Sequence, residues 1–195
     1  MCHWSVHCEP IVPRAFDSAI GFRYTNSIVT TKSKVRMIVQ SKMDAISEAT
    51  YEQFSEAAYQ SVDSLFGKLT AVNVSRSILL YQAHPRWREV SLAKLKATYS
   101  NVTFECVPTS KSAPLPDGRY DVIFVPLYGF TQAGYRLGHG GGWYDKLLAA
   151  QPRARRIGVG LEAGLIDFDV EEHDVPVDIL ITEKRCELLR DRTLG

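Results

Sequence analysis

The 195 residues of this chain are enough for one domain with a substantial hydrophobic core. Hydrophobic residues make up 45% of the chain and charged residues 23%, which is typical of a soluble globular protein. The formal net charge of +1 gives no global electrostatic reason to bind nucleic acid or a membrane surface. No apolar run approaches the roughly 20 residues that a membrane-spanning helix needs. We therefore expect small-molecule partners, with no nucleic acid and no membrane among them.

Residues 1–30 show no clear helical or strand period, and we predict a disordered or artefactual extension before a single domain over residues 31–190. A metal site in this segment is the alternative, although its potential ligands do not have the usual zinc-finger spacing: Cys2, His3, His7 and Cys8. The four cysteines of the chain are widely scattered, and the first residues do not form a signal-peptide pattern. We expect a cytoplasmic monomer.

The first predicted helix follows Thr31. Val35, Ile38 and Val39 recur at helical spacing, and Met43 and Ile46 continue the apolar stripe. This pattern predicts an amphipathic helix with those residues facing the core.

A second helix is predicted to begin at Thr50-Tyr-Glu-Gln53, which has the form of a capping box. Gly67 is its predicted end. Its predicted apolar face consists of Tyr51, Phe54, Ala58, Val62 and Leu65.

Five short β-rich runs follow, at residues 77–81, 102–107, 121–126, 156–161 and 177–182. Helices are predicted between some of them, at residues 90–99 and 143–150. Apolar strands that alternate with helices are typical of βαβ units. The sequence therefore predicts an α/β fold, a single domain whose largely parallel sheet is flanked by helices on both faces.

The strand at 121–126 leads into the glycine-rich sequence Gly-Tyr-Arg-Leu-Gly-His-Gly-Gly-Gly-Trp-Tyr-Asp at residues 134–145. Its glycines allow backbone N–H groups to approach an anion closely, and the following helix adds the positive end of its dipole. Arg136 offers a forked, permanently charged group for phosphate oxygens, and Asp145 a carboxylate for Mg²⁺. The sequence is neither a Walker A loop nor a good dinucleotide fingerprint. A flexible turn between strand and helix is the alternative.

This sequence, with Val125-Pro126 before it, resembles the signature of the 5-formyltetrahydrofolate cyclo-ligase family. Three further strings resemble the C-terminal stretch of the family in order and spacing: Ile157-Gly-Val-Gly-Leu161, Glu172-His-Asp-Val-Pro-Val-Asp178 and Ile181-Thr-Glu-Lys184. The resemblance covers residues 121–184. It implies the three-layer architecture of cyclo-ligases and NagB/RpiA-like proteins.

Two shorter strings in the N-terminal half resemble other parts of the family. Lys32-Ser-Lys-Val-Arg36 is similar to its opening helix, which implies that Lys32 binds ATP phosphate and that Arg36 lies between ATP and folate. Two solvated charges on a helix face are the alternative. Glu89-Val-Ser91 is similar to an element whose glutamate contacts the folate, although Ser91 replaces an aspartate.

The resemblance implies ATP- and Mg²⁺-dependent conversion of 5-formyltetrahydrofolate to 5,10-methenyltetrahydrofolate, with Arg136 and Lys32 as catalytic residues. The implied ATP-binding residues are Lys32, Arg36, Arg136, Leu137, Gly138, His139, Gly140, Gly141, Gly142, Trp143 and Tyr144. The implied substrate-binding residues are Arg36, Glu89, Trp143 and Tyr144, and the two aromatic residues are alternatively core side chains. The implied metal ligands are Asp145 and Asp174, of which Asp174 is alternatively a solvated loop carboxylate.

The chain departs from the family between the second and third predicted strands. Family members have a longer stretch there, with a Gly-Ile-x-x-Pro string that helps to wall the folate pocket, whereas only residues 109–120 fill the gap here. One alternative is therefore a non-catalytic homologue that binds nucleotide or folate. Another is a different phosphate-binding α/β enzyme, such as a sugar-phosphate isomerase.

Overall fold

The computed structural model describes residues 31–70, 77–107, 114–138 and 140–191. The predictions for residues 1–30 and for His139 lie outside these ranges. In chain order the elements are α1 Lys32–Asp44, α2 Glu48–Thr70, β1 Ser77–Leu80, the 3-10 helix η1 Pro85–Trp87, α3 Lys94–Thr98, β2 Thr103–Cys106, β3 Val122–Leu127, β4 Gly129–Phe130, β5 Arg136–Leu137, α4 Trp143–Ala150, β6 Arg155–Gly160, the 3-10 helix η2 Glu162–Gly164, β7 Ile179–Ile181 and β8 Cys186–Leu188.

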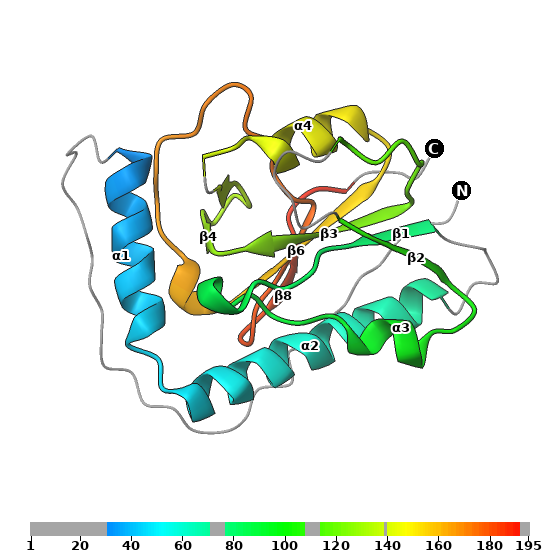
Figure 1. Cartoon of the computed structure of the whole chain (residues 1–195), viewed down its shortest axis with the longest axis horizontal. Helices are drawn as coiled ribbons and strands as arrows, with labels where there is room; N and C mark the ends of the chain where they lie inside the picture. The colour runs from blue at the N-terminus through cyan, green and yellow to red at the C-terminus, as the bar shows by residue number, and fades with distance from the viewer. Residues whose placement is uncertain (1–30, 71–76, 108–113, 139, 192–195) are drawn as a thin grey trace.

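The main sheet has six strands in the order β2-β1-β3-β6-β7-β8, which confirms the predicted α/β class. Neighbouring strands are parallel except for the antiparallel pair of β7 and β8. The central pair, β3 and β6, is in register from Val122 opposite Arg155 to Leu127 opposite Gly160. Helix α4 lies over one face of the sheet, and α2 and α3 lie over the other (Figure 1).

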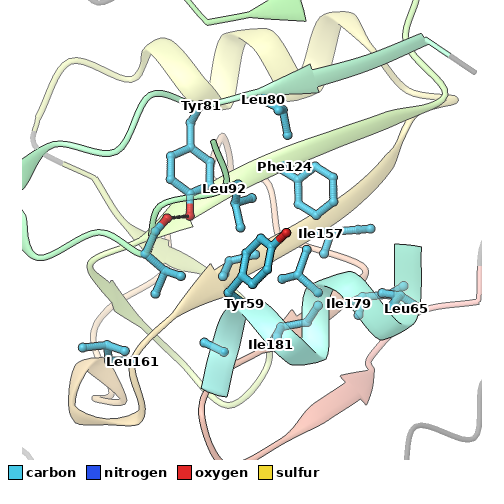
Figure 2. Close-up of a cluster of buried hydrophobic side chains, with 14 of the residues drawn as sticks. Tyr59, Leu65, Leu80, Tyr81, Leu92, Phe124, Ile157, Leu161, Ile179 and Ile181 are labelled. Atoms are coloured by element: carbon cyan, nitrogen blue, oxygen red, sulfur yellow. Dashed lines mark hydrogen bonds between the residues drawn. The ribbon is translucent and has the colours of Figure 1, made fainter. Parts of the chain in front are cut away.

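Alternate residues of β1, β3 and β7 enter two separate hydrophobic clusters, as the two-residue strand period requires. On β3, Phe124 packs in the cluster on the α2 side and Ile123 in the cluster on the α4 side. Figure 2 shows the α2-side cluster, where Tyr59 and Leu65 of α2 face Ile157 and other strand residues. Both faces of the sheet are thus covered by apolar side chains, and polar chemistry is left to the strand ends.

The strand order creates one preferred place for a ligand. The chain leaves β1 toward β2 on one side and leaves β3 toward β6 on the other. In open α/β sheets, connections that diverge in this way leave a crevice beyond the carboxyl ends of the two strands. We therefore expect the functional site beyond Leu80 and Leu127.

Helix α1 stands at the end of the sheet and packs through Val35, Val39 and Met43, as predicted. The helix ends before Ile46, so the predicted helical stripe was too long at that end. The prediction that Ile38 faces the core is wrong, because its side chain is 44% exposed. An apolar residue at helical spacing can lie just beyond the buried stripe, which spans only part of the helix surface. Within the described part of the chain, no helix combines the length and apolarity needed to cross a membrane.

The predicted bounds of the second helix are wrong at both ends. Helix α2 begins at Glu48, and the Ser47 hydroxyl accepts a hydrogen bond from the Thr50 backbone N–H at 3.2 Å. Ser47 is therefore the capping residue, three positions before the predicted start. Gly67 lies inside α2, where a Cβ atom would come within 3.3 Å of the Tyr99 hydroxyl. Close packing of this tyrosine, rather than helix termination, accounts for the glycine.

Three short strands were not predicted, and one helix is shorter than predicted. The two-residue strands β4 and β5 form an antiparallel hairpin, and β8 closes one edge of the main sheet. Runs of two or three residues carry no readable period. The helix expected at 90–99 is confined to α3, because Val90 and Leu92 are buried in an irregular segment before it.

Gly160 generates a stability prediction, because an added Cβ would lie 2.4 Å from the backbone carbonyl oxygen of Leu127 on the neighbouring strand. We expect Gly160→Ala to lower the free energy of unfolding by about 1–3 kcal/mol or more, as overpacking of a rigid core does. Chemical denaturation would measure the loss. Gly141→Ala is the matched control, because a Cβ there meets nothing within 4 Å. An equal effect of the two substitutions would contradict this account.

Candidate functional site

The site is built around Arg136, which the β4–β5 hairpin holds beyond the carboxyl end of β3. Arg136 pairs with Phe130 across the hairpin, and Gly134 turns the chain with a φ of 80°. The Arg136 guanidinium lies over the Tyr144 ring at 5.0 Å and forms an ion pair with Asp145 at 2.7 Å. The side chains of this pair are only 9% and 12% exposed.

The Arg136 guanidinium keeps unused hydrogen-bonding capacity. Its Nε atom is buried and has no hydrogen-bond partner among the described residues. A buried donor without a partner costs free energy, which a ligand that accepts a hydrogen bond from it would recover. The forked geometry of arginine fits the oxygens of a phosphate group. This donor set therefore suits an anion.

The glycine-rich segment beside Arg136 is open to solvent rather than sealed in the core. Gly140 and Gly141 are exposed, and a Cβ built on Gly141 or Gly142 would meet no atom within 4 Å. Gly142 caps the N-terminus of α4 in the left-handed conformation, with a φ of 58°. Packing against the described residues therefore does not explain the missing side chain at Gly141. A backbone without a side chain leaves space for a ligand to approach its N–H groups.

Helix α1 reaches the site through two cations one helical turn apart. Arg36 Nε donates to the carbonyl oxygen of Gly138 at 2.7 Å, which attaches α1 to the glycine-rich segment. Lys32 Nζ lies 2.8 Å from Asp174 and 3.2 Å from Glu171 on the loop before β7. The alternative of two solvated charges is therefore wrong for both, since each makes a specific tertiary contact and neither is exposed.

These contacts set the charge states around Lys32. Burial alone would lower the pKa of its ammonium group, but the hydrogen bonds that it donates to the Asp174 and Glu171 carboxylates outweigh burial and raise that pKa. Burial would likewise raise the pKa of Asp174, but the backbone N–H of Glu171 and the Lys32 ammonium lower it. Both groups are charged at neutral pH.

Glu89 lies beyond the carboxyl end of β1 and accepts a hydrogen bond from the His84 backbone N–H at 2.8 Å. Burial raises the pKa of its carboxyl group, and this single hydrogen bond only partly opposes the effect. The Glu89 charge reaches Tyr144, whose phenol pKa is raised mainly by burial and further by this carboxylate. Assignment of Glu89 to the same site as the residues after β3 stays a prediction.

The remaining predicted residues take different positions. Leu137 is only 2% exposed, so its side chain serves the core. Tyr144 packs against both hydrophobic clusters and Trp143 against the α4-side cluster, and the two rings meet edge to face. Core packing is thus established for both, and stacking on a ligand stays a prediction.

The two predicted metal ligands are both engaged by cations. Asp145 holds Arg136, and Asp174 holds Lys32. Within the described ranges, three potential ligand side chains have donor atoms within 4.8 Å of one another: Glu171, His173 and Asp174. Asp145 contacts the backbone N–H of Val175, next to this group, at 3.5 Å. Carboxylate oxygens are the ligands that Mg²⁺ prefers, so the donor types fit.

Two residues at the site were missed by sequence reasoning. Glu171 shares Lys32 with Asp174, but it is one of several acids in its segment and nothing in the sequence singles it out. Tyr128 donates to the carbonyl oxygen of Arg36 at 3.3 Å, and its position after β3 gave no chemical signal.

A polar groove of about 560 Å³ lies elsewhere, at the amino ends of β3 and β6. Residues 117–121 and 150–153 line it. None of the predicted site residues is among them. It lies at the opposite end of the sheet from the glycine-rich segment, so it does not belong to the candidate site.

Comparison with known proteins connects this geometry to one family. The model of the 5-formyltetrahydrofolate cyclo-ligase family matches residues 76–183. The 5-formyltetrahydrofolate cyclo-ligase of Escherichia coli (strain K12) is 35% identical over 74 residues, which cover 36% of this chain and 41% of that protein. That of Mycolicibacterium smegmatis is 40% identical over 70 residues, covering 35% and 36%. The chain thus matches about two fifths of the length of these curated relatives.

Solved structures share the fold over most of the chain. A 5,10-methenyltetrahydrofolate synthetase from Mycoplasma pneumoniae superposes with a TM-score of 0.63 at 24% identity, covering 80% of this chain and 100% of that one. The enzyme of the same name from Aquifex aeolicus gives a TM-score of 0.62 at 27% identity, covering 85% and 97%. Since the family match spans more than half of its residues, the protein belongs to the 5-formyltetrahydrofolate cyclo-ligase family.

Proposed function

We propose that this protein is an ATP- and Mg²⁺-dependent 5-formyltetrahydrofolate cyclo-ligase. In that reaction the formyl oxygen attacks the γ-phosphorus of ATP and ADP leaves. The N10 nitrogen then attacks the activated formyl carbon and loses its proton to solvent, and phosphate departs with the formyl oxygen to give 5,10-methenyltetrahydrofolate. The observation that carries the proposal is the buried Arg136 guanidinium, which keeps a donor without a partner beside a glycine-rich segment open to solvent.

This chemistry asks the protein mainly to position two substrates and to neutralise the moving phosphoryl group. Arg136 and Lys32 are the cations for the phosphate oxygens, and the backbone amides of Gly138, Gly140, Gly141 and Gly142 are assigned to the approach of the phosphates. Asp145 and Asp174 would hold Mg²⁺, which supplies charge neutralisation beside the phosphates when bound. Arg36 holds the segment in place through Gly138.

The folate is assigned to the side of the site nearest Glu89. Its half-buried carboxylate is suited to accept hydrogen bonds from the amino and amide N–H groups of a pterin ring. Arg36 contacts the glycine-rich segment through the carbonyl oxygen of Gly138, and we assign it to both substrates. Trp143 and Tyr144 complete the proposed substrate contacts.

The short connection at 109–120 favours a second candidate, a homologue that binds nucleotide or folate without turnover. Absorbance at the methenyltetrahydrofolate band, recorded with 5-formyltetrahydrofolate and MgATP, separates the two. Product formation supports the enzyme. A rise in melting temperature with MgATP but no product, from folded protein, supports the non-catalytic homologue.

Gly141 tests the phosphate approach without disturbing the fold. A methyl group at this position meets no protein atom within 4 Å, so we expect Gly141→Ala to leave the melting temperature unchanged. The same methyl group occupies space assigned to phosphate oxygens, so we expect the Kd for MgATP to rise about tenfold or more. Isothermal titration calorimetry would measure the Kd of MgATP and, for comparison, the Kd of 5-formyltetrahydrofolate. Unchanged MgATP affinity would rule out close approach of the nucleotide here.

Substitutions at Arg136 test whether catalysis needs its forked guanidinium group. Arg136→Lys keeps a positive partner for Asp145 but loses the paired donors, so we expect kcat to fall by about 100-fold with little loss of stability. Arg136→Ala should also lower the melting temperature, because it leaves the Asp145 carboxylate buried and unpaired. Steady-state kinetics and thermal denaturation measure these effects. A lysine variant with near-normal kcat would remove Arg136 from the mechanism.

Glu89 tests the folate side and gives a pH dependence. The folded-state pKa of Glu89 is raised by burial, so its charged form disfavours folding, and stability falls as the pH rises through that pKa. We expect Glu89→Gln to melt at a higher temperature than the native protein at pH 7, with the gap closing below about pH 4. The KM for 5-formyltetrahydrofolate should rise and that for ATP should not. A rise in the KM for ATP alone would contradict the assignment.

A further inference from the structure

The four charged side chains assigned to MgATP are paired with one another. Arg136 Nη2 lies 2.7 Å from Asp145 Oδ2, and Lys32 Nζ lies 2.8 Å from Asp174 Oδ2. Each cation assigned to phosphate thus holds a carboxylate assigned to metal. The two pairs come from different elements, α1 with the loop before β7 and β5 with α4.

These pairs are shielded from solvent. The side chains of Arg136 and Asp174 are each 9% exposed, that of Asp145 is 12% exposed and that of Lys32 is 21% exposed. A charge that loses its partner in such surroundings is strongly destabilised. If phosphate paired with Arg136 in the absence of a metal, the Asp145 carboxylate would lose its cationic partner. If a metal bound Asp145 alone, the Arg136 guanidinium would lose its anionic partner.

We propose that the two pairs are an exchangeable charge set that makes nucleotide binding conditional on the metal. This inference rests on the proposed function. When MgATP binds, Arg136 and Lys32 leave their carboxylates for phosphate oxygens, and Asp145 and Asp174 turn to the cation. Free ATP is rejected because the carboxylates already hold the cations and repel its charge.

The two pairs do not contribute equally. Lys32 lies 3.2 Å from Glu171 as well, so it keeps an anionic partner when Asp174 is neutralised. Asp174 in turn also accepts a hydrogen bond from the Glu171 backbone N–H at 2.8 Å. Within the described ranges, Asp145 is the one carboxylate in an ion pair with Arg136. The Asp145 carboxylate is therefore expected to oppose the binding of metal-free ATP more strongly than Asp174 does.

The test measures binding of metal-free ATP, in EDTA at fixed ionic strength, by isothermal titration calorimetry. We expect Asp145→Asn to bind metal-free ATP about tenfold more tightly than the native protein, because Arg136 loses its charged competitor. Asp174→Asn should bind it more tightly by a smaller factor. Neutralising an acid should therefore improve binding of the free nucleotide even where it abolishes turnover.

Glu52→Gln is the matched control, since it removes one negative charge from an exposed position on α2. An equal gain in that variant would show a general charge effect and overturn the exchange. The exchange would also be overturned if the Asp145→Asn variant bound metal-free ATP no better than the native protein does, provided that the native protein binds MgATP. Thermal denaturation verifies folding, and Asp145→Ser replaces the asparagine variant if that fails to fold. If the native protein neither binds MgATP nor forms product, the proposed function itself is wrong.

Discussion

Burial of both faces of the parallel sheet is the constraint on which the rest of this protein depends. Strand β6 is buried along its whole length, and β3 is buried except at Pro126. The two arginines of β6, Arg155 and Arg156, stand at its amino end, where they donate to the carbonyl oxygens of Arg190 and Leu148. A charged group farther along such strands would lose hydration without gaining a partner. Chemistry is therefore confined to the loops beyond the strands, and the divergence of the chain from β1 and β3 decides which loops meet there.

Those loops carry little regular structure of their own, so side-chain contacts fix them. Arg36 holds the glycine-rich segment through the carbonyl oxygen of Gly138, and Lys32 holds the loop before β7 through Asp174. Arg136 is wedged between the Tyr144 ring and Asp145. Backbone without side chains is free to move, and rigid surroundings are what allow it to present its amides in one arrangement.

The parts of the site that are local in sequence were predictable from it, and the distant contacts were not. Residues 134–145 can be recognised as a candidate site from the sequence alone, because glycines, Arg136 and Asp145 fall within one short stretch. The contact of Lys32 with Asp174 joins residues 142 positions apart, and only the resemblance to a family selected them. Helix ends were misjudged where tertiary packing decides them, as at Gly67, which contacts Tyr99. The hairpin β4–β5 is too short to carry a period.

The placement of two cations on α1 has a consequence for how this chain tolerates insertions. Lys32 and Arg36 lie on one side of the helix because four residues make about one turn. One residue added or removed between them would swing Lys32 by about 100° and carry it away from the loop that it holds. The spacing of these two residues within the first helix is therefore fixed by geometry.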